Sequence, residues 1–230
     1  MVEKGIKPAL AVKEGWPLGT NNWTQVCYGG MTAAALICAD AEPKLCAELI
    51  HRAVVNVPTV MKISYSPNGG YPEGPSYWDY GTGYNCILIA LLNHAFGTDF
   101  GLSEVPGWKT TGVYLASALT PSGNTYHYAD GMNECVPTFA NFYLASQYPD
   151  NVFFCPRSRE RLLWFARQKP KDGQLVNARQ IQLSMFYMDK SIGNAPPPAI
   201  QYWSGEGATL PIFLCRTAWT PDALYLGIKG

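Results

Sequence analysis

Apolar positions at helical spacing dominate most of the chain. The Ala-rich stretch Thr24–Asp40 predicts one helix, and Pro43–Lys62 predicts a second, in which Leu45, Leu49 and Ala53 recur at helical spacing after a proline suited to a first turn. Further helices are predicted over Tyr84–Phe96, Trp108–Leu119, 137–147, 150–168 and 177–188.

The pattern changes in the C-terminal tail. Leu210–Arg216 (LPIFLCR) and Ala223–Lys229 (ALYLGIK) have the composition of strands, and Thr220-Pro221-Asp222 between them is a turn signal. Because an isolated two-stranded hairpin is only marginally stable, we expect it to dock on the helices or to begin a further β domain.

The remaining segments are predicted to be loops. Residues 1–20 read as an irregular N-terminal segment, and Pro and Gly break the chain over Ser66–Tyr80 and Asn194–Thr209. Paired helices joined by long loops indicate a mainly α fold, an incomplete (α/α) toroid or barrel over 21–209, followed by a short C-terminal β-hairpin over 210–230.

Composition excludes several classes of protein. Of 230 residues, 47% are hydrophobic and 15% charged, with zero net charge, so the chain is neither disordered nor an obvious nucleic-acid binder. The longest apolar run, Cys86–Leu92, is too short to cross a bilayer, so no membrane insertion is expected. Seven cysteines without a CxxC or a zinc-ligand spacing predict mostly reduced, buried thiols, no metal site and no cofactor.

Two segments hold residue types that carry chemistry. In NNWTQ, Asn21 or Asn22 suits a helix N-cap, yet two amides, Trp23 and Gln25 also form a neutral cluster able to bind a carboxylate. The sequence YPEGPSYWDY, residues 71–80, is either an aromatic-packed turn or part of a site in which a tyrosine transfers a proton.

Acidic residues and histidines offer weaker candidates. Glu73 and Asp79 have the residue types of a glycosidase carboxylate pair, which would need a suitable separation across a cleft. His51 and His94 lie in predicted helices and are expected to be structural, whereas His127 lies among aromatic residues of a loop and is the better candidate.

The stretches NNWTQVCYGG, NGGYPEGPSYWDYGTGY, FGLSEVPGWKTTG, TPSGNTYHYADG and RTAWTPDALYLGIKG, taken in order, resemble heparinase II/III-type polysaccharide lyases and their alginate-lyase-like relatives. The resemblance implies a helical toroid followed by a β-sandwich domain. It also implies β-elimination of an acidic polysaccharide, in which the C5 proton of a uronate is removed and the 4-linked sugar is expelled.

The resemblance also implies roles for individual residues. Tyr77 matches the catalytic tyrosine, with Tyr71 and Tyr80 as alternatives, and Asn21 or Asn22 matches the asparagine that neutralises the uronate carboxylate. Residues expected to bind substrate are Trp23, Gln25, Tyr71, Glu73, Trp78, Tyr80, Tyr126, His127 and Asp130.

The family's β domain carries a catalytic histidine shortly after the strand that here reads LYLGIKG, and the sequence stops at Gly230. Residues 1–19 also lack a signal peptide. We therefore expect half of an active site, with weak or no turnover, from a parent protein that is periplasmic or secreted and carries the missing β domain. The alternatives are a non-catalytic carbohydrate-binding domain and a glycoside hydrolase on an α/α toroid.

Overall fold

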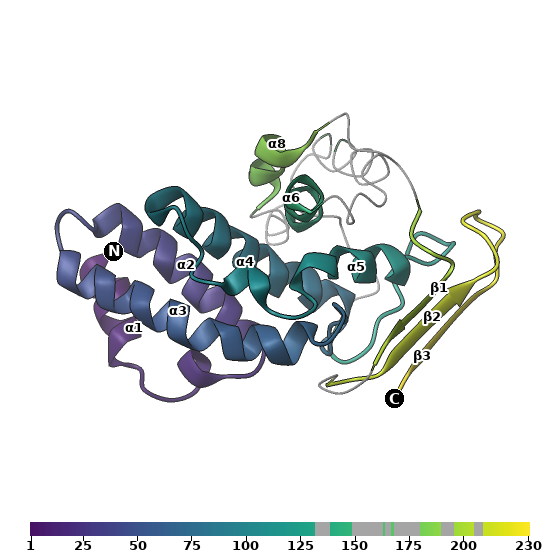
Figure 1. Cartoon of the computed structure of the whole chain (residues 1–230), viewed down its shortest axis with the longest axis horizontal. Coiled ribbons are helices and arrows are strands. Elements are labelled where there is room, and N and C mark those ends of the chain that lie inside the picture. Colours follow the sequence, from purple (N-terminus) through teal and green to yellow (C-terminus); the bar gives the residue numbers. More distant parts are fainter. Residues whose placement is uncertain (132–138, 149–162, 164–166, 168–179, 190–195, 205–208) are drawn as a thin grey trace.

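A computed structural model describes residues 1–131, 139–148, 163, 167, 180–189, 196–204 and 209–230. This part of the chain is mainly helical with a small antiparallel sheet (Figure 1). Its α-helices are α1 (Lys7–Ala11), α2 (Asn22–Cys38), α3 (Pro43–Tyr65), α4 (Pro75–Phe96), α5 (Gly112–Ala118), α6 (Phe139–Gln147) and α8 (Ser184–Tyr187), and its strands are β1 (Ile200–Trp203), β2 (Ile212–Arg216) and β3 (Tyr225–Lys229).

The long helix α2 packs against both α3 and α4 (Figure 1). It runs antiparallel to α3, because Gln25 bonds the end of α3 at Tyr65 whereas the later Tyr28 bonds the earlier Asn56. Helix α4 lies so close to α2 that a Cβ added at Gly29 would come within 2.6 Å of the carbonyl oxygen of Tyr84. Glycine at this position therefore permits the close approach of the two helices.

Helix α4 begins earlier than the sequence pattern predicts. The loop expected over Ser66–Tyr80 ends at Gly74, the N-cap residue, and Pro75 occupies the first turn of the helix. Proline is favoured there because its missing N–H has no partner to lose and its φ is already helical. Tyr77, Trp78 and Tyr80 consequently lie on a helix and not in a loop.

The N-terminal segment is also more ordered than predicted. A π-helical turn over Val2–Ile6 leads directly into α1, and a 3-10 turn follows at Trp16–Leu18. Ile6 and Leu10, four residues apart, are buried in the hydrophobic core. Because they are four residues apart, both side chains lie on one face of the helix. Their burial against the long helices stabilises this segment and offsets the helix-breaking tendency of nearby Gly and Pro.

The predicted C-terminal hairpin is confirmed, but the sheet is larger. Strand β2 pairs antiparallel with β3, and β1, within the loop predicted over Asn194–Thr209, pairs with the other edge of β2. The predicted boundary at residue 210 therefore divides a sheet. Trp203 of β1 is buried edge-on against Tyr114 of α5, so the sheet docks on the helical part.

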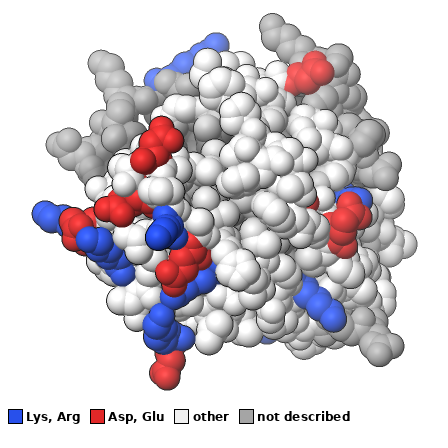
Figure 2. Space-filling model, turned by 60° about the vertical axis from the view of Figure 1, so that its left-hand side comes forward, with Lys and Arg blue, Asp and Glu red and all other residues white. Residues whose placement is uncertain are grey.

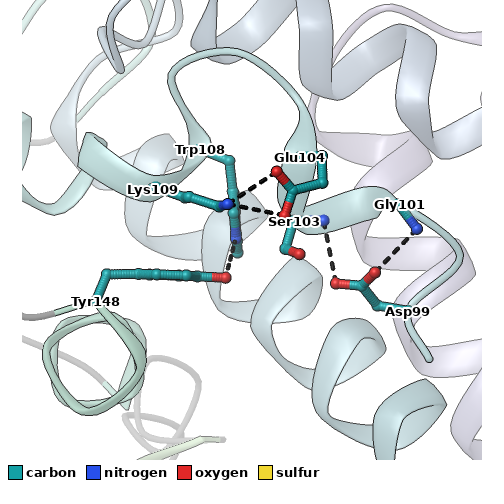
Figure 3. A network of polar contacts seen from close by, with 7 residues as sticks. All are labelled: Asp99, Gly101, Ser103, Glu104, Trp108, Lys109 and Tyr148. Carbon is teal, nitrogen blue, oxygen red and sulfur yellow. Dashed lines mark hydrogen bonds and ion pairs between the residues drawn. The ribbon is translucent and has the colours of Figure 1, made fainter. Parts of the chain in front are cut away.

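A polar network fastens the loop between α4 and α5 (Figure 3). Asp99 accepts hydrogen bonds from the backbone N–H groups of Gly101 and Ser103, at 2.9 and 3.1 Å. The indole N–H of Trp108 donates to the hydroxyl of Tyr148, just beyond α6, at 3.2 Å. This loop is thereby tied both to itself and to a helix distant in sequence.

The other predicted helices match in part. The helices expected at 108–119, 137–147 and 177–188 correspond to α5, α6 and the shorter α8. Most of the helix expected at 150–168, including Arg157, Arg159 and Arg161, lies outside the described residues. The cysteines among the described residues are free thiols, as expected: Cys27, Cys38, Cys46, Cys86 and Cys215. Only Cys46 and Cys86 are buried, whereas the other three are half-buried.

Candidate functional site

Three segments singled out in the sequence meet at one end of α2 and α4. The backbone N–H of Asn22 donates to Oε2 of Glu73 at 2.9 Å, and its side-chain amide donates to Oε1 at 2.8 Å. The hydroxyl of Tyr128 donates to the carbonyl oxygen of Tyr71 at 2.6 Å. The start of α2, the 71–76 segment and the 126–131 loop therefore form one assembly.

Both oxygens of the half-buried Glu73 carboxylate are engaged by Asn22 at the N-terminus of α2. A helix N-terminus favours an anion because its first N–H groups are unpaired and its dipole is positive there. Asn22 itself is buried, and its donors face the protein's own carboxylate. Asn22 thus positions the 71–76 segment through its backbone N–H and its side-chain amide.

Asn21 is the more accessible of the two asparagines. It is the N-cap of α2, and its side-chain oxygen accepts a hydrogen bond from the backbone N–H of Trp23 at 3.1 Å. Because the oxygen serves as the cap, the NH₂ group of this exposed side chain can donate to a ligand.

Two predicted substrate-binding residues lie inside the protein. Gln25 and Tyr71 are fully buried, and the Tyr71 hydroxyl donates to Oε1 of Gln25 at 2.7 Å. Burial raises the pKa of Tyr71 well above its ordinary value, so this tyrosine stays protonated at neutral pH. In this structure these side chains hold the site together and do not reach a substrate.

The same network is centred on Tyr65. The amide groups of Gln25 and Asn85 donate to its hydroxyl at 3.2 and 3.1 Å, and Oγ1 of Thr82 lies 3.0 Å away. A phenolic oxygen that accepts two bonds donates its one proton to the third partner, so Tyr65 bonds to Thr82 as a donor. The sequence pattern does not predict this central role of Tyr65, because Tyr65 follows the predicted end of its helix.

Trp78 is also buried. Its indole N–H donates to Oγ1 of Thr111 at 2.7 Å, and Thr111 in turn donates to the carbonyl oxygen of Gly69 at 2.7 Å. This tryptophan therefore ties α4 to the loop before α5 and offers no ring face to a sugar.

Other aromatic rings of the site are accessible. The Trp23 side chain is 62% exposed and that of Tyr80 is 39% exposed, with the Tyr80 ring edge-on to Tyr84 at 5.6 Å between centroids. Tyr77, in the first turns of α4, is half-buried against the core. An exposed indole or phenol ring suits stacking on a sugar while its polar edge forms hydrogen bonds.

The 126–131 loop places two further candidates at the surface. His127 and Asp130 are exposed, whereas Tyr126 is half-buried. The Tyr126 ring lies against β3, because a Cβ added to Gly227 would come within 2.6 Å of it. The buried Tyr128 between them, also missed from sequence, bonds to Tyr71. Alternate residues of this loop thus face the protein and the solvent.

Charge is unevenly distributed over the surface. On the face shown in Figure 2, many acidic and basic side chains gather toward the left margin, others lie near the top and right margins, and a broad area between them carries no charge. Within the described ranges, no group of three or more His, Cys, Asp and Glu side chains is placed to hold a metal ion. On this face, the described residues offer an anionic ligand no broad basic surface.

A separate hollow of about 180 Å³ lies beside the sheet, lined by Thr120, Pro121, Arg216, Trp219, Thr220 and Pro221. The guanidinium carbon of Arg216 lies 3.4 Å from the ring centroid of Trp219, and its Nη2 donates to the carbonyl oxygens of Ser117 and Leu119. Arg216 of β2 therefore links the sheet by hydrogen bonds to the end of α5 and the residue after it.

No protein-family model matches the chain, and no curated protein matches it. None of the described helices is long and apolar enough to span a membrane.

Proposed function

We propose that the chain is the helical part of a polysaccharide lyase that cleaves uronate-containing glycans by β-elimination. The observation that carries the proposal is the convergence of NNWTQ, the 71–80 segment and the 126–131 loop at one end of α2 and α4. These segments are far apart in sequence, and each belongs to the motifs that resemble such lyases. In this proposal the described helices belong to an incomplete (α/α) toroid.

The proposed chemistry begins at the uronate carboxylate. The amide NH₂ of Asn21, at the positive end of α2, donates to this carboxylate and stabilises the charge that develops as C5 loses its proton. Tyr77, the tyrosine that matches the family's catalytic residue, transfers protons at C5 or at the departing 4-oxygen. Trp23 and Tyr80 supply accessible rings for the flanking sugars.

The contacts of Glu73 disfavour a glycoside hydrolase. A hydrolytic acid must hold a proton and offer it to the glycosidic oxygen, and its partner carboxylate must face it across the sugar. Both oxygens of Glu73 instead accept N–H bonds from Asn22, so this carboxyl group is turned toward the protein and not toward a glycosidic oxygen. We accordingly propose an acidic glycan as substrate. We also propose that the protein acts in the periplasm or outside the cell.

The test measures binding and turnover separately. The chain is titrated with heparan sulfate, hyaluronan, chondroitin and alginate, with a neutral glucan as reference, and ultraviolet absorbance follows the unsaturated product. We expect selective binding of an acidic glycan with slow product formation. Tyr77→Phe is expected to abolish product formation with unchanged affinity, because it removes the proton and keeps the ring.

Asn21→Asp provides a sharp control for the carboxylate site. Aspartate still caps α2, so folding stability should be kept, but the donor is replaced by a negative charge. We expect glycan affinity to fall tenfold or more, whereas Asn93→Asp, an equal charge change at the other end of α4, should leave it unchanged. Equal effects of both variants, or no binding of any acidic glycan, would contradict the proposal.

A further inference from the structure

The sheet carries apolar side chains on both faces. In the register of the strands, Ile200, Cys215 and Leu226 lie side by side in one row. Tyr202, Phe213 and Ile228 form a second row on the same face, and Leu224, just before β3, extends this face beyond the first row. We call these seven residues the outer sheet face.

The opposite, inner face is the one that packs on the helices. It includes the buried Trp203, Ile212 and Leu214, together with Arg216, which bonds to the segment after α5. An antiparallel sheet with one solvated face normally alternates apolar inward and polar outward residues. On the three described strands, the side chains of the outer sheet face carry no charge, so this face does not follow the pattern of a solvated one.

The outer sheet face is extensively exposed. Five of its side chains range from 50% exposed at Leu226 to 75% at Leu224, with Tyr202 at 59%. These fractions amount to roughly 600 Å² of contiguous and largely apolar surface, at the upper end for a monomer. A stable interface of standard size buries about 800 Å² on each partner. The outer sheet face alone supplies most of that area.

We propose that a second copy of this chain covers the outer sheet face, so that two sheets pack face to face in a symmetric dimer. An isologous contact needs only one self-complementary patch, because a two-fold axis brings the same surface to both sides. Two uncharged faces on chains of zero net charge meet without electrostatic repulsion. The rows of mixed large and small apolar side chains suit the interdigitation of sheets about 10 Å apart.

The first measurement is the mass of the chain in solution by light scattering. At about 50 μM, well above the micromolar affinities to which interfaces of this size can fall, we expect twice the monomer mass. A monomer at this concentration would overturn the proposal. It would also be the result if a different protein, and not a second copy, covers the outer sheet face.

The second measurement locates the interface. In the double variant Leu226→Lys, Ile228→Lys, two charges replace exposed side chains of the strand at the edge of the sheet, so folding should be retained. We expect the dimer dissociation constant to rise at least a hundredfold, because four lysines would be buried in an apolar contact. Ile37→Lys, at an exposed apolar position of α2, is the matched control and should remain dimeric. A double variant that is folded by circular dichroism and still dimeric would show that this face is not the interface.

Discussion

The Tyr65 hydroxyl is the best place to test the buried network that supports the site. In Tyr65→Phe the ring keeps its packing, including the edge-on contact with Trp108 at 5.2 Å, and only the hydroxyl is lost. The amides of Gln25 and Asn85 then lose the bonds they donate to it, inside a fully buried cluster.

The magnitude follows from the number of donors left unpaired. Each buried polar group without a partner costs roughly 1–3 kcal/mol, and the hydroxyl oxygen of Thr82 also loses the proton that Tyr65 donates to it. We therefore expect Tyr65→Phe to lower the free energy of unfolding by about 3 kcal/mol. For a chain of this length, that loss lowers the melting temperature by about 6–12 °C.

Urea unfolding followed by circular dichroism measures the effect, with an unchanged m value showing that the variant has the native compactness. Tyr71→Phe should cost less, about 1–2 kcal/mol, because one buried acceptor, Oε1 of Gln25, loses the proton that Tyr71 donates. Tyr202→Phe, at an exposed position, should change stability by less than about 0.5 kcal/mol. A loss below about 1 kcal/mol for Tyr65→Phe, or a larger loss for Tyr202→Phe, would refute the network as described.

Two further perturbations probe the same interior. Gly81→Ala should destabilise the fold by about 2–3 kcal/mol in urea unfolding. The new Cβ would lie 2.5 Å from the Tyr71 hydroxyl and closer still to Oε1 of Gln25. Gly5→Ala, with open space around it, is the control and should leave stability nearly unchanged. Stability should also fall at alkaline pH. Burial raises several tyrosine pKa values above the unfolded value of about 10. Above this pH the unfolded state loses protons that the native state keeps. The contribution of these tyrosines to stability is therefore complete below pH 10 and declines above it, by up to about 1.4 kcal/mol per pH unit for each tyrosine. Among the described residues, the largest increases in pKa are those of Tyr65, Tyr71, Tyr128, Tyr143 and Tyr225. A urea midpoint that is the same at pH 8.5 and pH 10.5 would contradict this reasoning.

Local patterns predicted the elements that local physics determines. The apolar repeat identified α2 and α3, and alternating apolar residues around a turn signal identified β2 and β3. Strand β1 was missed because it follows a run of prolines, and pairing with the later β2 defines it. The start of α4 was missed because Pro, Gly and aromatic residues before Tyr84 have the composition of a loop.

The missed start of α4 also explains why the site was predicted only in part. Three tyrosines lie within ten residues, at 71, 77 and 80, and composition alone cannot rank their exposure. Once α4 begins at Pro75, its helical phase places Trp78, Thr82 and Asn85 inward and Tyr80 outward, because buried positions recur three and four residues apart. Tyr71 precedes the helix and turns inward to Gln25, a contact that no local pattern encodes.

The position of Glu73 constrains how an acidic sugar can bind. A uronate carboxylate held by Asn21 would lie roughly 6–8 Å from the Glu73 carboxylate, because Glu73 bonds the adjacent Asn22; at an effective dielectric constant of about 20, this repulsion costs about 2–3 kcal/mol. A charge-assisted hydrogen bond from Asn21 contributes about 1.5–3 kcal/mol. The positive end of α2 adds about 0.3–1 kcal/mol. The two favourable terms together slightly exceed this repulsion in the ground state, so the carboxylate contact should give a modest preference for an acidic over a neutral glycan. Ring contacts such as those of Trp23 should supply most of the affinity. As C5 loses its proton, further negative charge develops on the carboxylate, and a donor already in place then lowers the barrier by more than it tightens ground-state binding.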